Sequence, residues 1–388
     1  MGAPRTGAGR PRVLFLVTED WYFVSHRLAL AEHVRAAGFE VVVGTRCGAA
    51  AAHIRAAGIA LAEVPFERSL RHPLRDLRAL VACIRLIRRV RPDVVHLVSL
   101  KPILLGASAL ALAAPRTPAL WAFTGMGYLF TSEATLARCL RPLVTRLLAL
   151  LHRPHRSAVV VQNEDDRALL ASLHIADESL RVIAGAGVDL EAFRPREPLP
   201  AVPLVLLPAR LLRDKGVGEF AAAAARIRAT RPEVRCVLAG ALDRDNHGAI
   251  ERAELDDWLA RGIVEWWGHC TDMAAVYNEA TVVCLPSYRE GYSKALLEAA
   301  ACGRALVASD VPGCRELCRD GVTGRLVTAR DDAALAEAVL DLIDHPARCA
   351  DMGRAARELV EREHGVARVA EATVAVYREL IEAAGTDA

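Results

Sequence analysis

The sequence predicts an α/β protein made of two doubly wound domains, each with a parallel sheet. Short apolar runs rich in β-branched residues alternate with longer amphipathic segments, which is typical of parallel strands joined by crossover helices. The alternation lapses over residues 185–203, where glycine and proline are frequent, and then starts again. The length of 388 residues suits two domains of ordinary size.

The first half of the chain shows the alternation clearly. Gly38 and Gly58 each follow a helical pattern, and Pro92 follows a long arginine-rich one, so these residues are expected at helix ends. Strands are predicted at 13–17, 40–45, 59–66, 93–98, 119–125 and 157–163. Helices are predicted at 26–37, 53–57, 74–90, after Pro102 and at 134–152.

The second half repeats the pattern. Strands are predicted at 203–210, 234–240, 263–268, 281–287, 305–309 and 325–329. Helices are predicted at 218–229, 249–261, 273–278, from Ser293 to Gly303, at 333–344 and through the C-terminus. Open parallel sheets bind ligands outside the carboxyl ends of their strands, so two sheets in tandem predict a cleft that closes by a hinge motion.

Composition excludes several classes of protein. A hydrophobic content of 53% with 25% charged residues is typical of a globular chain, and a net charge of +2 gives no strong field for nucleic acid. The ten cysteines form no CxxC pair and no regular framework, which indicates reduced thiols and no metal site. No signal-peptide pattern is expected near the N-terminus, and the longest apolar stretch, 103–114, is shorter than the roughly 20 residues that span a bilayer.

Two acids flank the start of one predicted helix. Glu290 lies between the strand 281–287 and a helix that begins near Ser293, and Glu298 lies inside that helix. Unpaired amides and the helix dipole make such a start an anion site, while the two carboxylates could accept hydrogen bonds from sugar hydroxyls. The alternative, which the spacing alone favours, is an acid that stabilises the helix dipole together with one surface glutamate.

Two cations follow the first strand of the second domain. Arg210 ends this strand and Lys215 comes five residues later, before Gly216; only three of the chain's 49 basic residues are lysines. A bidentate guanidinium and a compact ammonium at a strand end suit a diphosphate. A solvated basic turn is the alternative, and the combination with the two glutamates makes it the less favoured one.

At this point the sequence resembles a known family. Arg210, the DKG around Lys215, the E-x7-E of Glu290 and Glu298, and the following VPGCREL look like the retaining nucleotide-sugar glycosyltransferases of family 4, also called group 1. The resemblance covers nearly the whole chain and implies the GT-B fold, in which two Rossmann-like domains face each other across a cleft. DWYFVSHRLALA and FTGMGYLF look like the branch that builds capsule, O-antigen and glycoprotein glycans on polyprenyl carriers.

The resemblance implies a role for each motif. Arg210 and Lys215 would stabilise the diphosphate leaving group, Glu290 would bind hydroxyls of the donor sugar, and Glu298 would bind the ribose. The backbone amides of Ser293, Lys294 and Ala295 would reach the phosphates, and Gly291 and Tyr292 beside them would also bind the donor. Gly268 and His269 would contact the base through their main chain. It further implies an acceptor-binding domain at 1–195, a donor-binding domain at 196–365, and a C-terminal helix at 366–388 that packs back on the first domain.

Acceptor-side residues are less sharply defined. His26, with Arg27 at the start of the first predicted helix, could face the cleft or could be a plain helix-terminus histidine. Thr124 with Gly125 could approach a ligand or form a tight turn. Many family members have a Gly-Gly pair in the first β–α loop, where this chain has residues 18–20, TED.

The resemblance implies transfer of a hexose or N-acetylhexosamine from a UDP-sugar to a polyprenyl-diphosphate-linked saccharide, with no cofactor and no metal. Asp243 and Asp245 form a D-x-D that could hold a metal, although no other acids cluster near them.

The segment 71–91 contains seven arginines among apolar residues, which predicts either an ordinary solvated helix or contact with anionic lipid. We therefore expect a cytoplasmic protein on the inner face of the membrane. A sugar-nucleotide epimerase and a two-domain binding protein are the alternatives.

Overall fold

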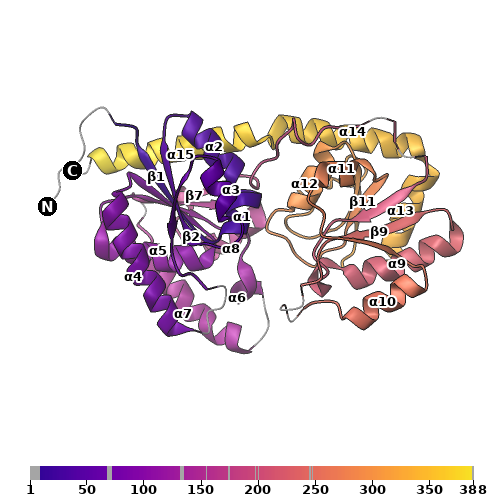
Figure 1. Cartoon of the computed structure of the whole chain (residues 1–388), viewed down its shortest axis with the longest axis horizontal. Helices are drawn as coiled ribbons and strands as arrows, with labels where there is room; N and C mark the ends of the chain where they lie inside the picture. The colour runs from indigo at the N-terminus through magenta and orange to yellow at the C-terminus, as the bar shows by residue number, and fades with distance from the viewer. Residues whose placement is uncertain are drawn as a thin grey trace. The chain divides into compact units, whose positions relative to one another are not determined.

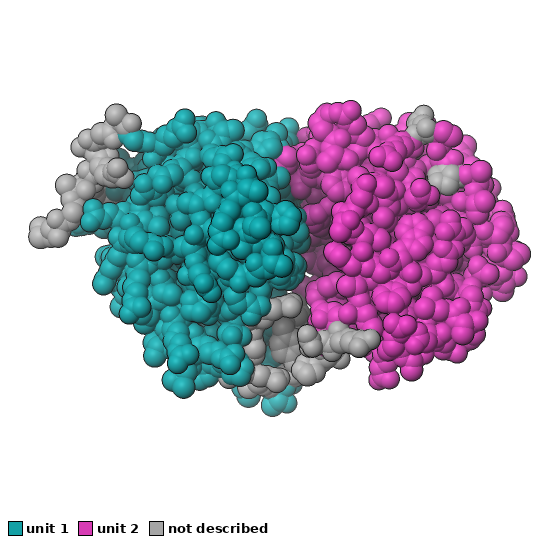
Figure 2. Space-filling view, viewed as in Figure 1, with its two compact units in different colours: residues 1–186, 367–388 teal, residues 187–366 magenta. Residues whose placement is uncertain are grey.

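The computed structural model describes residues 9–67, 72–131, 135–153, 155–173, 175–196, 198–199, 201–243, 246 and 248–386. Two compact units make up the chain, and each is described by itself. Unit 1 comprises Met1–Ala186 with Ala367–Ala388, and unit 2 comprises Gly187–Val366 (Figure 2). The division after Ala186 falls within the segment 185–203, whereas the domain boundary predicted after residue 195 lies further along that segment.

Unit 1 is built on a sheet of seven parallel strands in its described part, in the order β3-β2-β1-β4-β5-β6-β7. This order reverses between β1 and β4, the arrangement of a doubly wound sheet. The strands are β1 (Arg12–Glu19), β2 (Glu40–Arg46), β3 (Ala60–Glu63), β4 (Val94–Val98), β5 (Ala119–Ala122), β6 (Ser157–Val161) and β7 (Leu180–Val182).

Helices cover both faces of this sheet because successive strand residues point to opposite sides. Leu14 and Leu16 pack with α4, α5 and α7, whereas Val13 and Phe15 pack with α2, α3 and α15. Figure 1 shows these helices around the strands of unit 1. The helices are α1 (Asp20–His26), α2 (Leu28–Ala36), α3 (Ala51–Ala56), α4 (Pro73–Val90), α5 (Leu100–Ala113), α6 (Gly127–Thr131), α7 (Thr135–Leu151), α8 (Glu164–Ser172) and α15 (Val366–Thr386), with a 3-10 turn η1 (Asp177–Ser179).

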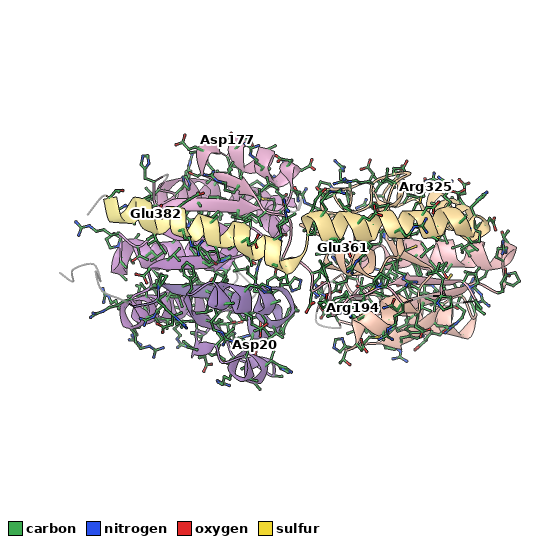
Figure 3. All side chains as sticks on the ribbon, turned by 90° about the horizontal axis from the view of Figure 1, so that it is seen from above. Asp20, Asp177, Arg194, Arg325, Glu361 and Glu382 are labelled. Carbon is green, nitrogen blue, oxygen red and sulfur yellow. The ribbon has the colours of Figure 1, made fainter. Side chains whose placement is uncertain are left out.

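The C-terminal helix α15 packs against the core of unit 1. Its apolar residues Ala370, Val374, Tyr377 and Leu380 recur at helical spacing and are buried against the strands. Figure 3 shows this helix, labelled at Glu382, along the elements of unit 1.

The helix predicted at 26–37 corresponds to α2, but a separate helix, α1, precedes it and was not predicted. Arg27, with φ −131° and ψ −14°, separates α1 from α2. The strand β1 runs directly into α1, and the carboxylate of Asp20 accepts hydrogen bonds from the amides of Trp21 (2.8 Å) and Gly48 (2.6 Å). Asp20 is labelled in Figure 3. His26 therefore ends a helix rather than beginning one.

Unit 2 holds a second parallel sheet, of six strands in its described part, in the order β10-β9-β8-β11-β12-β13. Its order reverses between β8 and β11, which places a second switch point there. The strands are β8 (Leu204–Leu207), β9 (Arg235–Ala239), β10 (Glu265–Gly268), β11 (Val282–Leu285), β12 (Ala305–Ser309) and β13 (Gly324–Val327).

The two faces of this sheet again take alternate residues. Val205 and Leu207 pack with α9 and α13, and Leu204 and Leu206 pack with α12 and α14. The helices are α9 (Val217–Thr230), α10 (Arg252–Ala260), α11 (Met273–Asn278), α12 (Lys294–Ala301), α13 (Asp332–Asp344) and α14 (Pro346–Glu363), with a 3-10 turn η2 (Arg213–Lys215). Two doubly wound parallel sheets confirm the predicted α/β class.

Candidate functional site

The residues predicted to bind a diphosphate follow two neighbouring strands of unit 2. Lys215 follows β8, and Glu290 follows β11, the strand paired with β8 where the strand order reverses. Ligands of doubly wound sheets bind at the carboxyl ends of strands at such a point. The sequence therefore brings these two loops to the position where the fold offers a binding site.

A close backbone approach joins the two loops. Gly216 has φ 70°, and a Cβ there would lie 2.1 Å from the carbonyl oxygen of Pro286, so only glycine fits. The amide of Tyr288 donates to the carbonyl of Asp214 at 2.9 Å. The DKG motif thus fixes the loop after β8 against the loop after β11.

Lys215 and Glu290 form an ion pair. Lys215 Nζ lies 2.6 Å from Glu290 Oε1, and the hydroxyl of Ser287 donates to the same oxygen at 2.7 Å. Their side chains are 22% and 13% exposed, so the pair is partly screened from water but open to a ligand. Ser287 was not predicted; its position at the carboxyl end of the strand 281–287 is the signal that could have found it.

The segment VPG, residues 311–313, holds Glu290 in place. It follows β12, the strand next to β11 in the sheet. The amide of Glu290 donates to the carbonyl of Pro312 at 3.2 Å, and the amide of Ser293 donates to the carbonyl of Gly313 at 2.9 Å. Gly313 has φ 81°, and a Cβ there would lie 2.6 Å from the carbonyl oxygen of Glu290. These contacts give a local reason for glycine in VPGCREL.

The helix α12 begins beside this loop. The hydroxyl of Ser293 caps it by accepting a hydrogen bond from the amide of Leu296 at 3.2 Å. Of the three amides predicted to reach a phosphate, that of Ser293 is engaged by Gly313. Those of Lys294 and Ala295 belong to the first turn, where amides have no partner within the helix.

Glu298 is buried, with 5% of its surface exposed, so the alternative of a surface glutamate is wrong. Its Oε2 accepts a hydrogen bond from the hydroxyl of Tyr277 at 3.1 Å, and its Oε1 pairs with Lys294. Burial, and next the charge of Glu298, raises the pKa of Tyr277. The carboxylate is therefore held by two partners next to the start of α12.

Arg210 does not join the pair formed by Lys215 and Glu290. Its guanidinium binds the carboxylate of Asp243 at 2.7 Å, and its side chain is 42% exposed. One acid of the predicted D-x-D is thus engaged by an arginine, and the other, Asp245, lies outside the described residues. Among the residues the structure describes, no group of three or more His, Cys, Asp or Glu side chains is placed to hold a metal.

Two tyrosines of the loop after β11 form hydrogen bonds to side chains of other segments. The hydroxyl of Tyr288 donates to Glu219 at 2.6 Å, and Arg330 stacks 4.4 Å from its ring; burial, and next Glu219, raises the pKa of Tyr288 to about 12. Tyr292 is hydrogen-bonded to His364, with 3.1 Å between its hydroxyl and Nδ1. Burial lowers the pKa of His364 to about 4 and raises that of Tyr292.

The predicted base-side residues lie at the sheet edge beyond β9. Gly268 ends β10 with φ 69°, and the exposed His269 follows it. In the sheet order, β9 separates β10 from β8, the strand that leads to Lys215.

The predicted acceptor-side residues belong to unit 1. The ring of His26 stacks on Tyr22 with 4.2 Å between centroids, and its Nδ1 lies 2.6 Å from the hydroxyl of Ser25. The hydroxyl of Thr124 lies 3.0 Å from that of Ser99, so the carboxyl ends of β4 and β5 meet there. Gly125 has φ 117° and Ser99 has φ 75°, an unusual value for a serine that sequence reasoning missed.

Two family models match the chain in succession. Residues 12–156 match the glycosyl transferase 4-like model, and residues 202–345 match the model of the glycosyl transferases group 1. The two matches fall in unit 1 and unit 2, respectively.

Individual relatives agree with these models. The chain is 34% identical over 239 residues to D-inositol 3-phosphate glycosyltransferase from an Arthrobacter species, covering 58% of this chain and 56% of the relative. It is 27% identical over 233 residues to the N,N'-diacetylbacillosaminyl-diphospho-undecaprenol alpha-1,3-N-acetylgalactosaminyltransferase of Campylobacter jejuni, covering 57% and 60%. The match thus spans little more than half the length of either relative.

The fold extends over the full length of a solved structure. The Anabaena protein Alr3699/HepE, crystallised with UDP and glucose, aligns with a TM-score of 0.78 and 19% identity, covering 94% of this chain and 98% of that one. Both family matches and the paired parallel sheets identify the chain as a glycosyltransferase of the GT-B fold.

Proposed function

We propose that the chain is a retaining glycosyltransferase that moves a hexose or N-acetylhexosamine from a UDP-sugar to a polyprenyl-diphosphate-linked saccharide. The observation that carries the donor half of this proposal is the ion pair between Lys215 and Glu290 at the switch point of unit 2. Lys215 offers a cation for the leaving group, and Glu290 offers an acceptor for sugar hydroxyls. One hydrogen bond joins the two side chains, so both groups are close to the same ligand.

The donor would exchange partners with this pair. Without a ligand, Lys215 neutralises Glu290; a diphosphate oxygen would take over the ammonium and leave the carboxylate to accept hydrogen bonds from the sugar. Charge builds on the diphosphate as the glycosidic bond breaks, and fixed cations stabilise it most in that state. Arg210 and the first amides of α12 would add donors, so the reaction would need no metal.

The nucleoside would lie along the same edge of the sheet. Glu298, held between Tyr277 and Lys294, would accept hydrogen bonds from the ribose. The main chain of Gly268 and His269 would contact the base. UDP is favoured because the Anabaena structure of the same fold contains UDP and glucose.

The acceptor half rests on the relative from Campylobacter jejuni, whose name specifies a diphospho-undecaprenol saccharide. His26, Thr124 and Gly125 of unit 1 would bind the acceptor's sugar. An acceptor on a polyprenyl carrier stays in a membrane, so its enzyme must work at a lipid surface.

Two helices of unit 1 present suitable surfaces for lipid. On α4, Leu74, Leu77 and Val81 are exposed, at 76%, 55% and 36%. The arginines Arg78 and Arg85, also exposed, follow on the same helical stripe. Exposed leucines beside arginines are typical of helices that lie on anionic bilayers.

The helix α7 repeats this arrangement. Leu143 and Leu150 are 64% and 78% exposed, and the exposed Arg146 lies between them at helical spacing. Both α4 and α7 pack against α5, so they cover the same face of the sheet. In the part of the chain that the structure describes, no helix is both long and apolar enough to span a bilayer. We propose peripheral contact with the inner face of the membrane.

The test begins with nucleotide binding. A nucleotide present at 100 times its Kd should stabilise the protein by about 2.7 kcal/mol, which a thermal-shift screen of nucleotides and nucleotide sugars detects. We expect UDP and UDP-sugars to stabilise the chain in EDTA. Calorimetry in which no nucleoside diphosphate binds would refute the proposal.

Turnover separates the proposal from its alternatives. Transfer to a polyprenyl-diphosphate-linked saccharide, with the anomeric configuration retained by NMR, is the expected result. Conversion of the donor without an acceptor would indicate an epimerase instead. Tight binding without turnover, unchanged in Lys215→Ala and Glu290→Ala, would indicate a binding protein.

A further inference from the structure

A small polar cavity in unit 1 belongs to none of the sites above. It lies between the sheet and α15 and is partly open to solvent. Four polar side chains, Arg27, His96, Gln162 and Thr373, line it among apolar ones. The volume of the cavity is about 10 Å³, which is enough for about one atom the size of a water oxygen.

Arg27 brings a buried positive charge to this cavity. Only 5% of the residue is exposed, and its Nε has no hydrogen-bond partner. No ion pair joins its guanidinium to a carboxylate among the described residues of either unit. Burying a charge without a counter-charge costs several kcal/mol, and such charges are paired in folded proteins as a rule. The cavity therefore lacks an anion on the protein's side.

His96 adds a hydrogen-bond donor to the same cavity. It is 2% exposed, its Nδ1 lies 2.5 Å from the hydroxyl of Tyr377, and its Nε2 has no partner. Burial lowers the pKa of His96 and raises that of Tyr377, so the imidazole is neutral and the phenol keeps its proton. With Tyr377 as the donor to Nδ1, the single imidazole proton lies on Nε2.

The remaining polar lining groups fit this picture. Gln162, 7% exposed, supplies a carboxamide with two N–H donors. The hydroxyl of Thr373 donates its proton to the carbonyl of Val369 at 2.7 Å, within α15. Donors from Arg27, His96 and Gln162 thus line a space of one atom, and no acid among the described residues lines it.

We propose that this cavity binds one oxygen of a phosphate group, with Arg27 as its counter-ion. The planar guanidinium matches an oxyanion better than a halide because its N–H groups form a fork. The volume admits a single oxygen, so the rest of the phosphate group lies outside the cavity. The phosphate is either inorganic or the diphosphate of a polyprenyl carrier; only the second source depends on the proposed function.

The site can be tested apart from the diphosphate site of unit 2. Phosphate binding is measured by calorimetry and thermal shift at constant ionic strength, in a Lys215→Ala background that removes the competing cation. Adding Arg27→Gln should weaken phosphate binding by about tenfold or more, as expected for a buried charged hydrogen bond. Arg55→Gln removes the same charge from the exposed surface of α3 and should change nothing.

Further outcomes decide the proposal. If Arg27→Gln does not fold, Gln162→Leu serves instead and should weaken phosphate binding while leaving the charge of Arg27 in place. Equal phosphate affinity in Arg27→Gln and Arg55→Gln would overturn the site, and chloride binding as tightly as phosphate would overturn the assignment to an oxyanion.

The source of the phosphate is decided by competition. Farnesyl diphosphate that displaces phosphate and binds more tightly, in an Arg27-dependent way, would identify the carrier's diphosphate. Binding of inorganic phosphate but not of farnesyl diphosphate would identify free phosphate as the ligand. That result would not affect the proposal for the donor site in unit 2.

Discussion

Lys215 Nζ lies 2.6 Å from Glu290 Oε1, although 75 residues separate the two in the chain. Each follows one of two paired strands, β8 and β11, so the contact is a product of sheet topology. The same topology places the capped start of α12 directly after Glu290's loop. A cation, an acid and a helix start thus meet within unit 2.

The two members of this pair should fail in different ways. Lys215→Ala should weaken UDP binding and lower transfer by about a hundredfold, as for the loss of one group that stabilises charge in the transition state. Glu290→Gln should leave UDP binding intact or tighter, because it releases Lys215, while transfer falls by a similar factor. Calorimetry with UDP and initial transfer rates measure both effects.

Arg213→Ala is the matched control, because Arg213 lies in the same 3-10 turn and pairs with Glu254. We expect it to bind UDP as the wild type does. If Lys215→Ala and Arg213→Ala behaved alike, Lys215 would have no special part in binding the diphosphate.

Glu298 should determine how strongly the protein prefers a nucleotide that carries the ribose hydroxyls. Wild-type protein should bind UDP about tenfold more tightly than 2′,3′-dideoxy-UDP, since a buried carboxylate left without its hydroxyl partners costs about 1–3 kcal/mol. Glu298→Gln should reduce this preference, and Glu290→Gln should keep it. A preference that persists in Glu298→Gln would place the ribose elsewhere.

Much of this site could be predicted because strand order and chemistry point to the same place. The strands before Arg210 and Glu290 are continuous apolar runs, and the carboxyl ends of such strands bind ligands. The partner of Arg210 could not be predicted. Arg210 binds Asp243 because loop conformation decides which of several nearby opposite charges meet. The pair of Lys294 with Glu298, in contrast, follows from i,i+4 spacing within α12.

The fold shows the same division between pattern and local geometry. Buried strands and long helices were predicted within a few residues, while α8 was missed although Asn163 caps it by accepting a hydrogen bond from the amide of Asp166 at 2.7 Å. The helix α1 was also missed: the prediction began a helix at His26, where α1 ends, and Arg27 separates α1 from α2.

Gly313 should be indispensable for the shape of the Glu290 loop. Gly313→Ala places a Cβ 2.6 Å from the carbonyl oxygen of Glu290 at a positive φ, so the loop must move. We expect a loss of about 1–3 kcal/mol in the free energy of unfolding, with weakened UDP binding. Urea denaturation and calorimetry measure the two effects.

Gly218→Ala provides the comparison, because Gly218 lies in α9 with nothing within 4 Å of an added Cβ. It should be neutral or stabilise by up to about 1 kcal/mol. Equal stability of the two variants would show that the loop tolerates a side chain at position 313.

His364 should make stability depend on pH below neutrality. Its pKa is about 4 in the fold, below the ordinary value of 6.5, so the unfolded chain binds the proton more readily. Its contribution is fully present above pH 6.5 and falls as pH drops towards 4, by at most about 1.4 kcal/mol per pH unit. His364→Gln should therefore lose less stability than wild type between pH 7 and pH 5.

His53→Gln is the control, because His53 is exposed on α3. Its stability should follow pH as the wild type's does. Identical pH profiles for His364→Gln and wild type would mean that His364 stays as easily protonated in the fold as in water.

The arginine stripe of α4 should control attachment to anionic vesicles. The exposed residues Arg78, Arg85 and Arg88 share one face of this helix and have no ion pair among the described residues. Each basic residue near an anionic surface contributes about 1 kcal/mol, so changing all three to glutamate should lower partitioning by about a hundredfold or more. Sedimentation with phosphatidylglycerol vesicles measures this, and added salt should weaken binding by the wild type.

A triple variant of unit 2 with Arg252, Arg261 and Arg354 changed to glutamate alters the net charge equally, and these exposed residues all lie in acid-paired positions. It should still sediment with the vesicles. The double variant Leu74→Ser with Leu77→Ser should also weaken attachment, because the two leucines bury apolar surface in the lipid. Added salt should not reduce this apolar contribution to binding. Equal loss in both charge variants would mean that net charge, and not the face of α4, attracts the protein to lipid.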